Sequence, residues 1–197
     1  LTVNVTWSDT EAQKNKRPET VTIQVKKISN MPSTFSLRKA VARTLNDNME
    51  LVQSYEMNTA TETSHTFTNL AKYDTNGNEI VYTIAEVIES KFYTQNIDQS
   101  TKTITNTFTV PRDTINLPVT ITWNDNQNAA GKRPESIGLQ LEQNGTNRGE
   151  QITVTGESTA NTWNYTYENL PKYDANGDEY TYTVDKIINS EFYEIDE

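Results

Sequence analysis

The chain contains two copies of one sequence unit. Residues 69–79 read NLAKYDTNGNE and residues 169–179 read NLPKYDANGDE, so this block recurs after 100 residues. A second block, KRPE, recurs after 116 residues, as does the tryptophan that precedes it (Trp7 and Trp123). Solenoid repeats are about 20–50 residues long. A unit of this length therefore predicts two domains of one fold, which we place at residues 1–110 and 114–197.

Apolar and polar residues alternate in many short segments of both copies, a pattern typical of half-buried strands. The opening segment LTVNVTW places Leu, Val, Val and Trp on one face, and VTITW at residues 119–123 repeats it. Such segments, separated by turn residues, predict an all-β sandwich for each copy, with about seven strands. Residues 102–108 form the last predicted strand of the first copy, and the second copy lacks it. Either the fragment ends early, or an open groove accepts a strand from a neighbouring molecule.

The first copy has about 16 extra residues, which we place in an insertion at about residues 31–58. Within it Leu37, Val41 and Leu45 recur at helical spacing, so we predict a short helix that decorates the first domain. The outer side of this helix has three basic residues, which are the candidate ligand-binding residues: Arg38, Lys39 and Arg43. Functional segments are often grafted onto rigid scaffolds. The alternative is a helix that only covers a sheet edge.

Composition argues against several function classes. The net charge is −10 and no basic stripe is present, which argues against a nucleic-acid partner. No apolar run approaches the length of a membrane span. His65 is the only histidine and cysteine is absent, so we expect no catalytic triad, no metal site, no cofactor and no enzyme activity. The DxNGxE blocks at residues 74–79 and 174–179 do not match a calcium loop, because their glycine is fourth rather than sixth. We predict turns there.

The order of these motifs is similar to a known family. A tryptophan, a polar loop, Lys-Arg-Pro, a strand, NL(P)KYDxNG and YT(I/V) together resemble the B-type domain of collagen adhesins (Cna B-type), over residues 1–109 and 114–197. The resemblance implies immunoglobulin-like modules that form stalks in surface adhesins and pilins of Gram-positive bacteria. It therefore implies a structural spacer beside neighbouring repeats of the same chain, anchored to the cell wall through a part of the parent protein outside these residues. The alternative is direct binding of a host extracellular-matrix protein or glycan through the insertion.

Many modules of that family have a Lys–Asn isopeptide bond, promoted by a buried acid. The resemblance places the lysine two residues before the tryptophan, where this chain has Val5 in the first copy and Ile121 in the second. The acid position holds Glu86 and Lys186, respectively, and the asparagine position of the first copy is Asn106. Because the lysine amine is the nucleophile, we expect neither copy to form the bond. Glu86 is then either a buried acid hydrogen-bonded to Asn106 or a surface residue in a shifted register.

Overall fold

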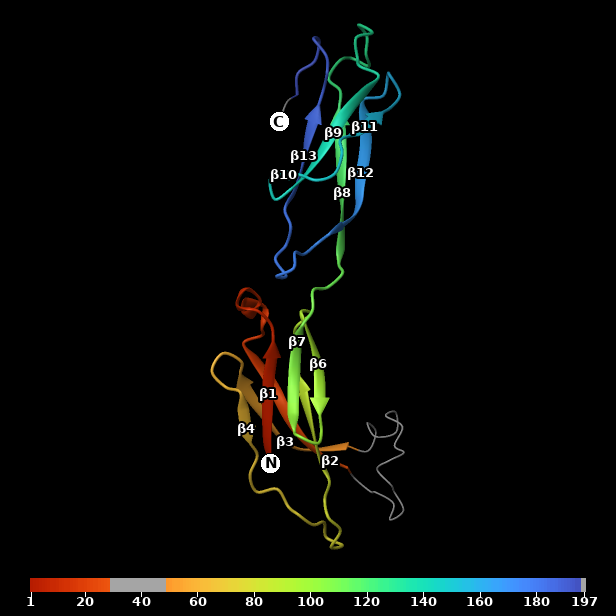
Figure 1. The fold of residues 1–197 in the computed structure, drawn as a ribbon. Coiled ribbons are helices and arrows are strands. Elements are labelled where there is room, and N and C mark those ends of the chain that lie inside the picture. The colour runs from red at the N-terminus through yellow and green to blue at the C-terminus, as the bar shows by residue number, and fades with distance from the viewer. Residues whose placement is uncertain (29–48, 196–197) are drawn as a thin grey trace. The chain divides into compact units, whose positions relative to one another are not determined.

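The computed structural model describes residues 1–28 and 49–195 of the chain. The chain divides into two compact units, Leu1–Val110 (domain 1) and Pro111–Glu197 (domain 2), each built mainly of strands (Figure 1). The predicted all-β fold is thus confirmed. The predicted short helix, with Arg38, Lys39 and Arg43, lies outside the described residues. Within them, no helix is long and apolar enough to cross a bilayer.

Domain 1 is a sandwich of two sheets. One sheet has the order β4-β1-β7-β6 and the other the order β3-β2-β5. The first and last strands of the domain, β1 and β7, are parallel neighbours (Figure 1). The strands are β1 (Thr2–Ser8), β2 (Thr20–Ile28), β3 (Met49–Asn58), β4 (Ser64–Thr66), β5 (Tyr82–Val87), β6 (Tyr93–Asp98) and β7 (Thr103–Phe108).

The core of domain 1 follows from the alternation of its strands. Alternate residues of β1 and β2 point inward, whereas the threonines between them face outward. Burial of one such aliphatic side chain is worth roughly 1.5–3 kcal/mol. Packing between the two sheets therefore dominates the stability of the domain. The buried cluster is Val3, Val5, Val21, Ile23, Val25, Met57, Phe67, Ile84 and Ile104.

The last part of the predicted insertion forms a β-strand. Residues 49–58 form β3, which pairs antiparallel with β2 from Thr20 to Ile28. In domain 2 the same place beside β9 (Ser136–Gln143) is taken by β10 (Thr146–Asn147) and β11 (Ile152–Thr155). Only Met57 of β3 is buried, and the pairing shifts register near its middle. The alternation that marks the other strands is therefore absent from this one.

A short helix lies in the segment that follows Trp7, where the sequence predicts only a polar loop. It is the 3-10 helix η1 (Glu11–Lys16), which has no buried residue. The backbone N–H of Thr10 donates to Gln13 Oε1 at 2.9 Å, and Lys14 pairs with Glu11 at 2.6 Å. Helical periodicity could not identify η1, because none of its residues faces the core.

Domain 2 repeats the arrangement with fewer described strands. One sheet pairs β8 (Thr114–Thr122) with β12 (Thr162–Pro171), and in the other β9 lies between β13 (Tyr182–Ile187) and the β10 and β11 segments. In the part of domain 2 that the structure describes, no strand corresponds to β6 or β7. The buried cluster is Ile121, Trp123, Ile137, Leu139, Leu141, Val154, Trp163, Tyr167 and Leu170.

Candidate functional site

A buried polar pair lies inside domain 1. The side-chain amide of Asn106, on β7, is fully buried and donates through Nδ2 to Glu86 Oε1 at 3.1 Å. The amide of Gln95 donates to Glu86 Oε2 at 3.0 Å. Glu86 is 8% exposed, so of the two arrangements open to it the structure has the buried, hydrogen-bonded one. Among the described residues Asn106 Oδ1 has no hydrogen-bond donor, and an unpaired buried carbonyl costs free energy.

Val5 occupies the position at which the family resemblance places a lysine. Its side chain is 1% exposed and lies opposite Ile104 in the parallel pairing of β1 and β7. Asn106 is two residues further along β7 and, like Ile104, faces the core. The structure thus brings the positions of nucleophile, acid and asparagine into one core. Only an acid and an amide are present there, because valine has no amine to attack the amide carbon.

Burial raises the pKa of Glu86, and the hydrogen bonds from Asn106 and Gln95 oppose that rise. The native state therefore holds the Glu86 proton more tightly than the unfolded state does. Stability is then lost as the pH rises above the ordinary carboxyl value of 4.5. The ionised form of Glu86 therefore stabilises domain 1 less than the protonated form does.

Glu86→Gln should therefore raise the free energy of unfolding of domain 1 at about pH 7.5, by on the order of 1 kcal/mol. The new amide accepts from Gln95 and donates to Asn106 Oδ1 after rotation of the Asn106 amide. The gain should shrink as the pH falls toward the ordinary carboxyl value. Denaturant unfolding followed through the Trp7 indole resonance measures it. Glu56→Gln, at an exposed position of β3, is the control, and a pH-independent or negative change for Glu86→Gln would contradict the prediction.

Domain 2 has a cation where domain 1 has the acid. Lys186 lies opposite Leu139 in the pairing of β13 with β9, as Glu86 lies opposite Ile23 in the pairing of β5 with β2. Ile121, at the lysine position of the second copy, is buried. Domain 2 therefore has no lysine at the nucleophile position and no carboxylic acid at the acid position.

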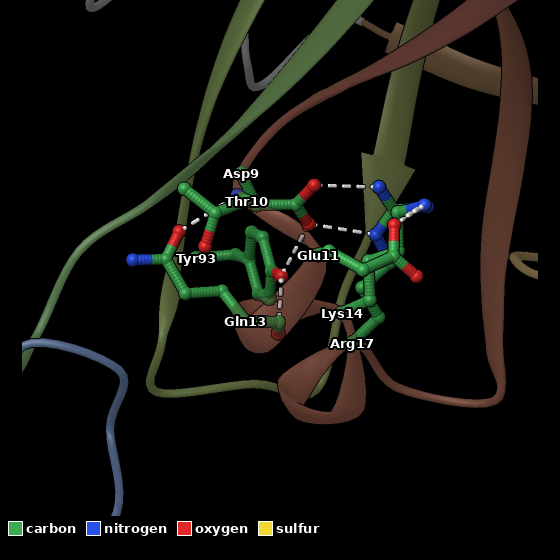
Figure 2. Close-up of polar contacts among 7 residues, drawn as sticks. All are labelled: Asp9, Thr10, Glu11, Gln13, Lys14, Arg17 and Tyr93. Carbon is green, nitrogen blue, oxygen red and sulfur yellow. Dashed lines mark hydrogen bonds and ion pairs between the residues drawn. The ribbon is translucent and has the colours of Figure 1, made fainter.

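A second constellation, which the sequence analysis missed, lies at the signature motifs of domain 1. Arg17, from the KRP block, donates to both carboxylate oxygens of Asp9, at 2.7 and 2.6 Å (Figure 2). The hydroxyl of Tyr93 donates to Asp9 Oδ2 at 2.6 Å. The Arg17 guanidinium also lies over the Trp7 ring, 4.8 Å from its centroid, and Trp7 meets Tyr93 edge-on. Arg17 holds the pKa of Asp9 below its ordinary value.

The same constellation recurs in domain 2. Arg133 donates to the two carboxylate oxygens of Asp125 at 2.8 and 2.5 Å, and to the carbonyl of Ala160 at 2.6 Å. The hydroxyl of Tyr193 donates to Asp125 Oδ2 at 2.8 Å, and Arg133 lies over the Trp123 ring. The Arg133 side chain is 1% exposed. We refer to this set and its counterpart in domain 1 as the Asp–Arg clamps.

The Asp–Arg clamps had a sequence signal. Each aspartate lies two residues after its tryptophan, and Asp9 and Asp125 are separated by the same 116 residues as the KRPE blocks. The sequence predicts only a polar loop around each aspartate, because sequence spacing alone does not indicate which arginine the aspartate faces. The clamps fix the loop after the first strand of each domain, which is a structural role.

The repeated KYDxNG blocks form turns. Asp74 Oδ1 accepts from the backbone N–H of Asn76 and Asn78, each at 2.8 Å, and Asp174 makes the equivalent pair of bonds. Gly77 has a φ of +83°, which glycine adopts without strain. The carboxylates of both aspartates are thus engaged by their own turns.

Several known proteins have sequences similar to this chain. The family model of the Cna protein B-type domain matches residues 1–107 and 117–196. A collagen adhesin of Staphylococcus aureus is 33% identical over 187 residues, which cover 95% of this chain but only 13% of that protein. A solved single B repeat unit (B1) of the collagen-binding surface protein Cna of S. aureus is 27% identical over 97% of this chain and 86% of its own, with a TM-score of 0.41. The structure of two such units (B1B2) is 28% identical over 96% of this chain and 43% of its own, with a TM-score of 0.40.

Proposed function

The chain belongs to the Cna B-type domain family, and from this membership we propose that residues 1–197 act as a spacer in a surface adhesin of a Gram-positive bacterium. Such a spacer holds a binding region away from the cell and performs no chemistry of its own. The duplication of one all-β unit within the chain supports this role. The related collagen adhesin of S. aureus supports a cell-surface location.

The pairing of β1 with β7 is the observation that supports a load-bearing role most strongly. The chain enters domain 1 through β1 and leaves it through β7, and the two strands pair in parallel from Asn4 to Ser8 and from Thr103 to Thr107. Parallel neighbours place the two ends of the domain at opposite ends of the pair. A force on the ends therefore shears all these backbone hydrogen bonds together, instead of opening them one at a time.

We further propose that the spacer has no intramolecular isopeptide bonds. In domain 1 an aliphatic side chain, Val5, fills the nucleophile position beside an intact Glu86–Asn106 pair. In domain 2 both Ile121 and Lys186 depart from the reactive pattern. Each domain then resists force through packing, strand pairing and its Asp–Arg clamp alone.

Single-molecule extension tests this proposal. Domain 1 should unfold in one step that releases the full length of its about 110 residues, on the order of 300–350 Å. A bond between positions 5 and 106 would limit the release to the few residues outside it, which is a few tens of Å. A release that short, or unfolding at forces too low to distinguish from an unstructured chain, would contradict the spacer proposed here.

A direct ligand-binding role is the second candidate, because the relative that the chain matches is named a collagen adhesin. It would use the insertion with Arg38, Lys39 and Arg43, which lie outside the described residues. Saturable binding of collagen or another extracellular-matrix protein or glycan, lost on deletion of residues 29–48, would favour this role over the spacer.

A further inference from the structure

One edge of β5 in domain 1 is covered by side chains rather than by another strand. The first edge of β5 pairs with β2, and in the described part of domain 1 no strand pairs with its second edge. Backbone hydrogen bonds of a strand in an antiparallel pair alternate between its two edges. Tyr82, Ile84 and Glu86 direct theirs toward the second edge. A free edge of this kind is a template for pairing with another chain.

Gln99 occupies the middle of the second edge. Its carboxamide accepts from the backbone N–H of Ile84 through Oε1 at 2.9 Å, and it donates through Nε2 to the carbonyl of the same residue at 2.7 Å. One residue of an antiparallel neighbour would make the same two bonds to Ile84 through its own N–H and C=O. The Gln99 side chain therefore takes the place of a residue in a neighbouring strand.

Lys102 covers the next backbone group along the second edge. Its Nζ donates to the carbonyl of Tyr82 at 2.8 Å. The backbone of Lys102 has a φ of +55°, a left-handed conformation that glycine adopts with less strain than lysine. Glycine, however, has no side chain that could reach β5. The strained lysine therefore indicates a role for its side chain at this edge.

Both side chains come from the turn that joins β6 to β7. The pairing of Asp98 with Thr103 closes this turn, and Asp98 Oδ1 accepts from the backbone N–H of Ser100 at 2.8 Å. The carbonyl of Lys102 accepts from the backbone N–H of Asn4, on β1, at 3.0 Å. The turn is thus fixed to its own sheet, and from there it holds Gln99 and Lys102 against a strand of the opposite sheet.

The second edge of β5 is complementary to a second copy of itself. Ile84 lies midway between Tyr82 and Glu86, so an antiparallel copy centred on Ile84 would bond all three residues at once. Such a contact has two-fold symmetry and is closed. The segment YTIAEV at residues 82–87 is rich in β-branched and aromatic residues, and its one charged side chain, Glu86, is buried. No exposed charge on β5 therefore opposes the pairing.

We propose that Gln99 and Lys102 form an autoinhibitory contact, which keeps β5 from pairing with β5 of a second copy of the chain. They supply to Ile84 and Tyr82 the hydrogen bonds that the second copy would otherwise supply. Without these two side chains the second edge has unpaired backbone groups, which a second copy can satisfy by strand addition.

Self-association of variants of residues 1–197 tests this proposal. Gln99→Ala and Lys102→Gly each open part of the second edge, and the double variant opens both parts. We expect sedimentation to show a dimer association constant for the double variant that is roughly tenfold or more above that of the natural chain. Gln53→Ala is the control, because Gln53 donates to the carbonyl of Thr68 from β3, the other edge strand of the same sheet. It should associate no more than the natural chain does.

Amide hydrogen exchange locates the effect. In dilute Gln99→Ala the Ile84 amide should exchange roughly tenfold faster than in the natural chain, measured relative to the amide of Ala85, which faces β2. In the concentrated double variant the Ile84 amide should become protected again as dimers form. Association through other surfaces is common to the natural chain and the variants, so it cancels in the comparison.

Three results would overturn the proposal. They are unchanged exchange of the Ile84 amide in Gln99→Ala, a double variant that associates no more than the natural chain, and association that leaves the Ile84 amide unprotected. If the double variant does not fold, Gln99→Asn provides the same comparison, because its shorter side chain cannot reach both backbone groups of Ile84.

Discussion

Arg133→Ala should lower the free energy of unfolding of domain 2 by about 3 kcal/mol, the lower end of the range for a broken buried ion pair. The substitution leaves the Asp125 carboxylate, which is 10% exposed, without its bidentate partner. It also removes the cation from the Trp123 ring and the donor from the Ala160 carbonyl. Denaturant unfolding followed through the Trp123 indole resonance measures the loss.

Two further variants identify the cause of that loss. Arg112→Ala removes an exposed arginine of the same domain, and should change stability by less than about 0.5 kcal/mol. Arg133→Lys keeps the positive charge but lacks the planar guanidinium that binds both carboxylate oxygens. Its loss in free energy of unfolding should lie between those of Arg133→Ala and Arg112→Ala. A loss for Arg133→Ala no larger than that for Arg112→Ala would show that the Asp–Arg clamp is not structural.

The clamp also gives the stability of domain 2 a pH dependence of known sign. Hydrogen bonds from Arg133 hold the pKa of Asp125 well below its ordinary value of 3.8. Its contribution is therefore fully present above that value and is lost as the pH falls through the lower folded-state pKa. Arg133→Ala should therefore reduce the loss of stability that domain 2 shows at acid pH. The sign of this pH dependence is opposite to that of Glu86, whose contribution to the stability of domain 1 is lost as the pH rises.

Val5→Lys should restore covalent crosslinking in domain 1. Asn106 lies two residues along the neighbouring strand from position 5, about 6.6 Å along the strand and about 4.8 Å across it. A lysine side chain at position 5 is long enough to reach the Asn106 carboxamide over this separation. The amine attacks the Asn106 carboxamide carbon, the Nζ–Cγ bond forms, the Cγ–Nδ2 bond breaks, and ammonia leaves after Glu86 has transferred the proton. The variant should then be lighter by one ammonia than its sequence. Closing a loop of about 100 residues should stabilise it by on the order of 4–5 kcal/mol.

The controls for this variant separate reaction from packing. Val5→Met fills the core without an amine and should keep its full mass. The double variant Val5→Lys, Glu86→Gln should keep its full mass, because the acid that transfers the proton is missing. It should also be less stable than the crosslinked Val5→Lys variant. A folded Val5→Lys protein of full mass would contradict the prediction, because it would show that a lysine at this position does not react with Asn106.

The residues themselves predicted most of the fold. Alternation identified β1 and β8 as core strands, because each of these strands buries residues on one face only. β3 was missed because its pairing shifts register and a single residue, Met57, is buried. η1 was missed because it has no buried face. Hydrophobic periodicity in a sequence reflects the burial of one face of an element. An element without a buried face therefore cannot be recognised from this periodicity.

The candidate site, like the fold, could be predicted from the sequence only in part. The resemblance selected Val5, Glu86 and Asn106, and the structure brings these positions into one core. It did not select the Asp–Arg clamps, because the partner of an acid depends on how a loop folds back. The place of Lys186, opposite Leu139 in the pairing of β13 with β9, required the sheet register.

The intact mass of the natural chain, residues 1–197, tests the central claim most directly. If Val5 and Ile121 leave both domains without a lysine at the nucleophile position, the folded protein should have the full mass of its sequence. Incubation in the folded state should not change that mass. A protein lighter by one or two ammonia molecules would contradict the account, because it would show that a crosslink forms through residues other than those at the expected positions.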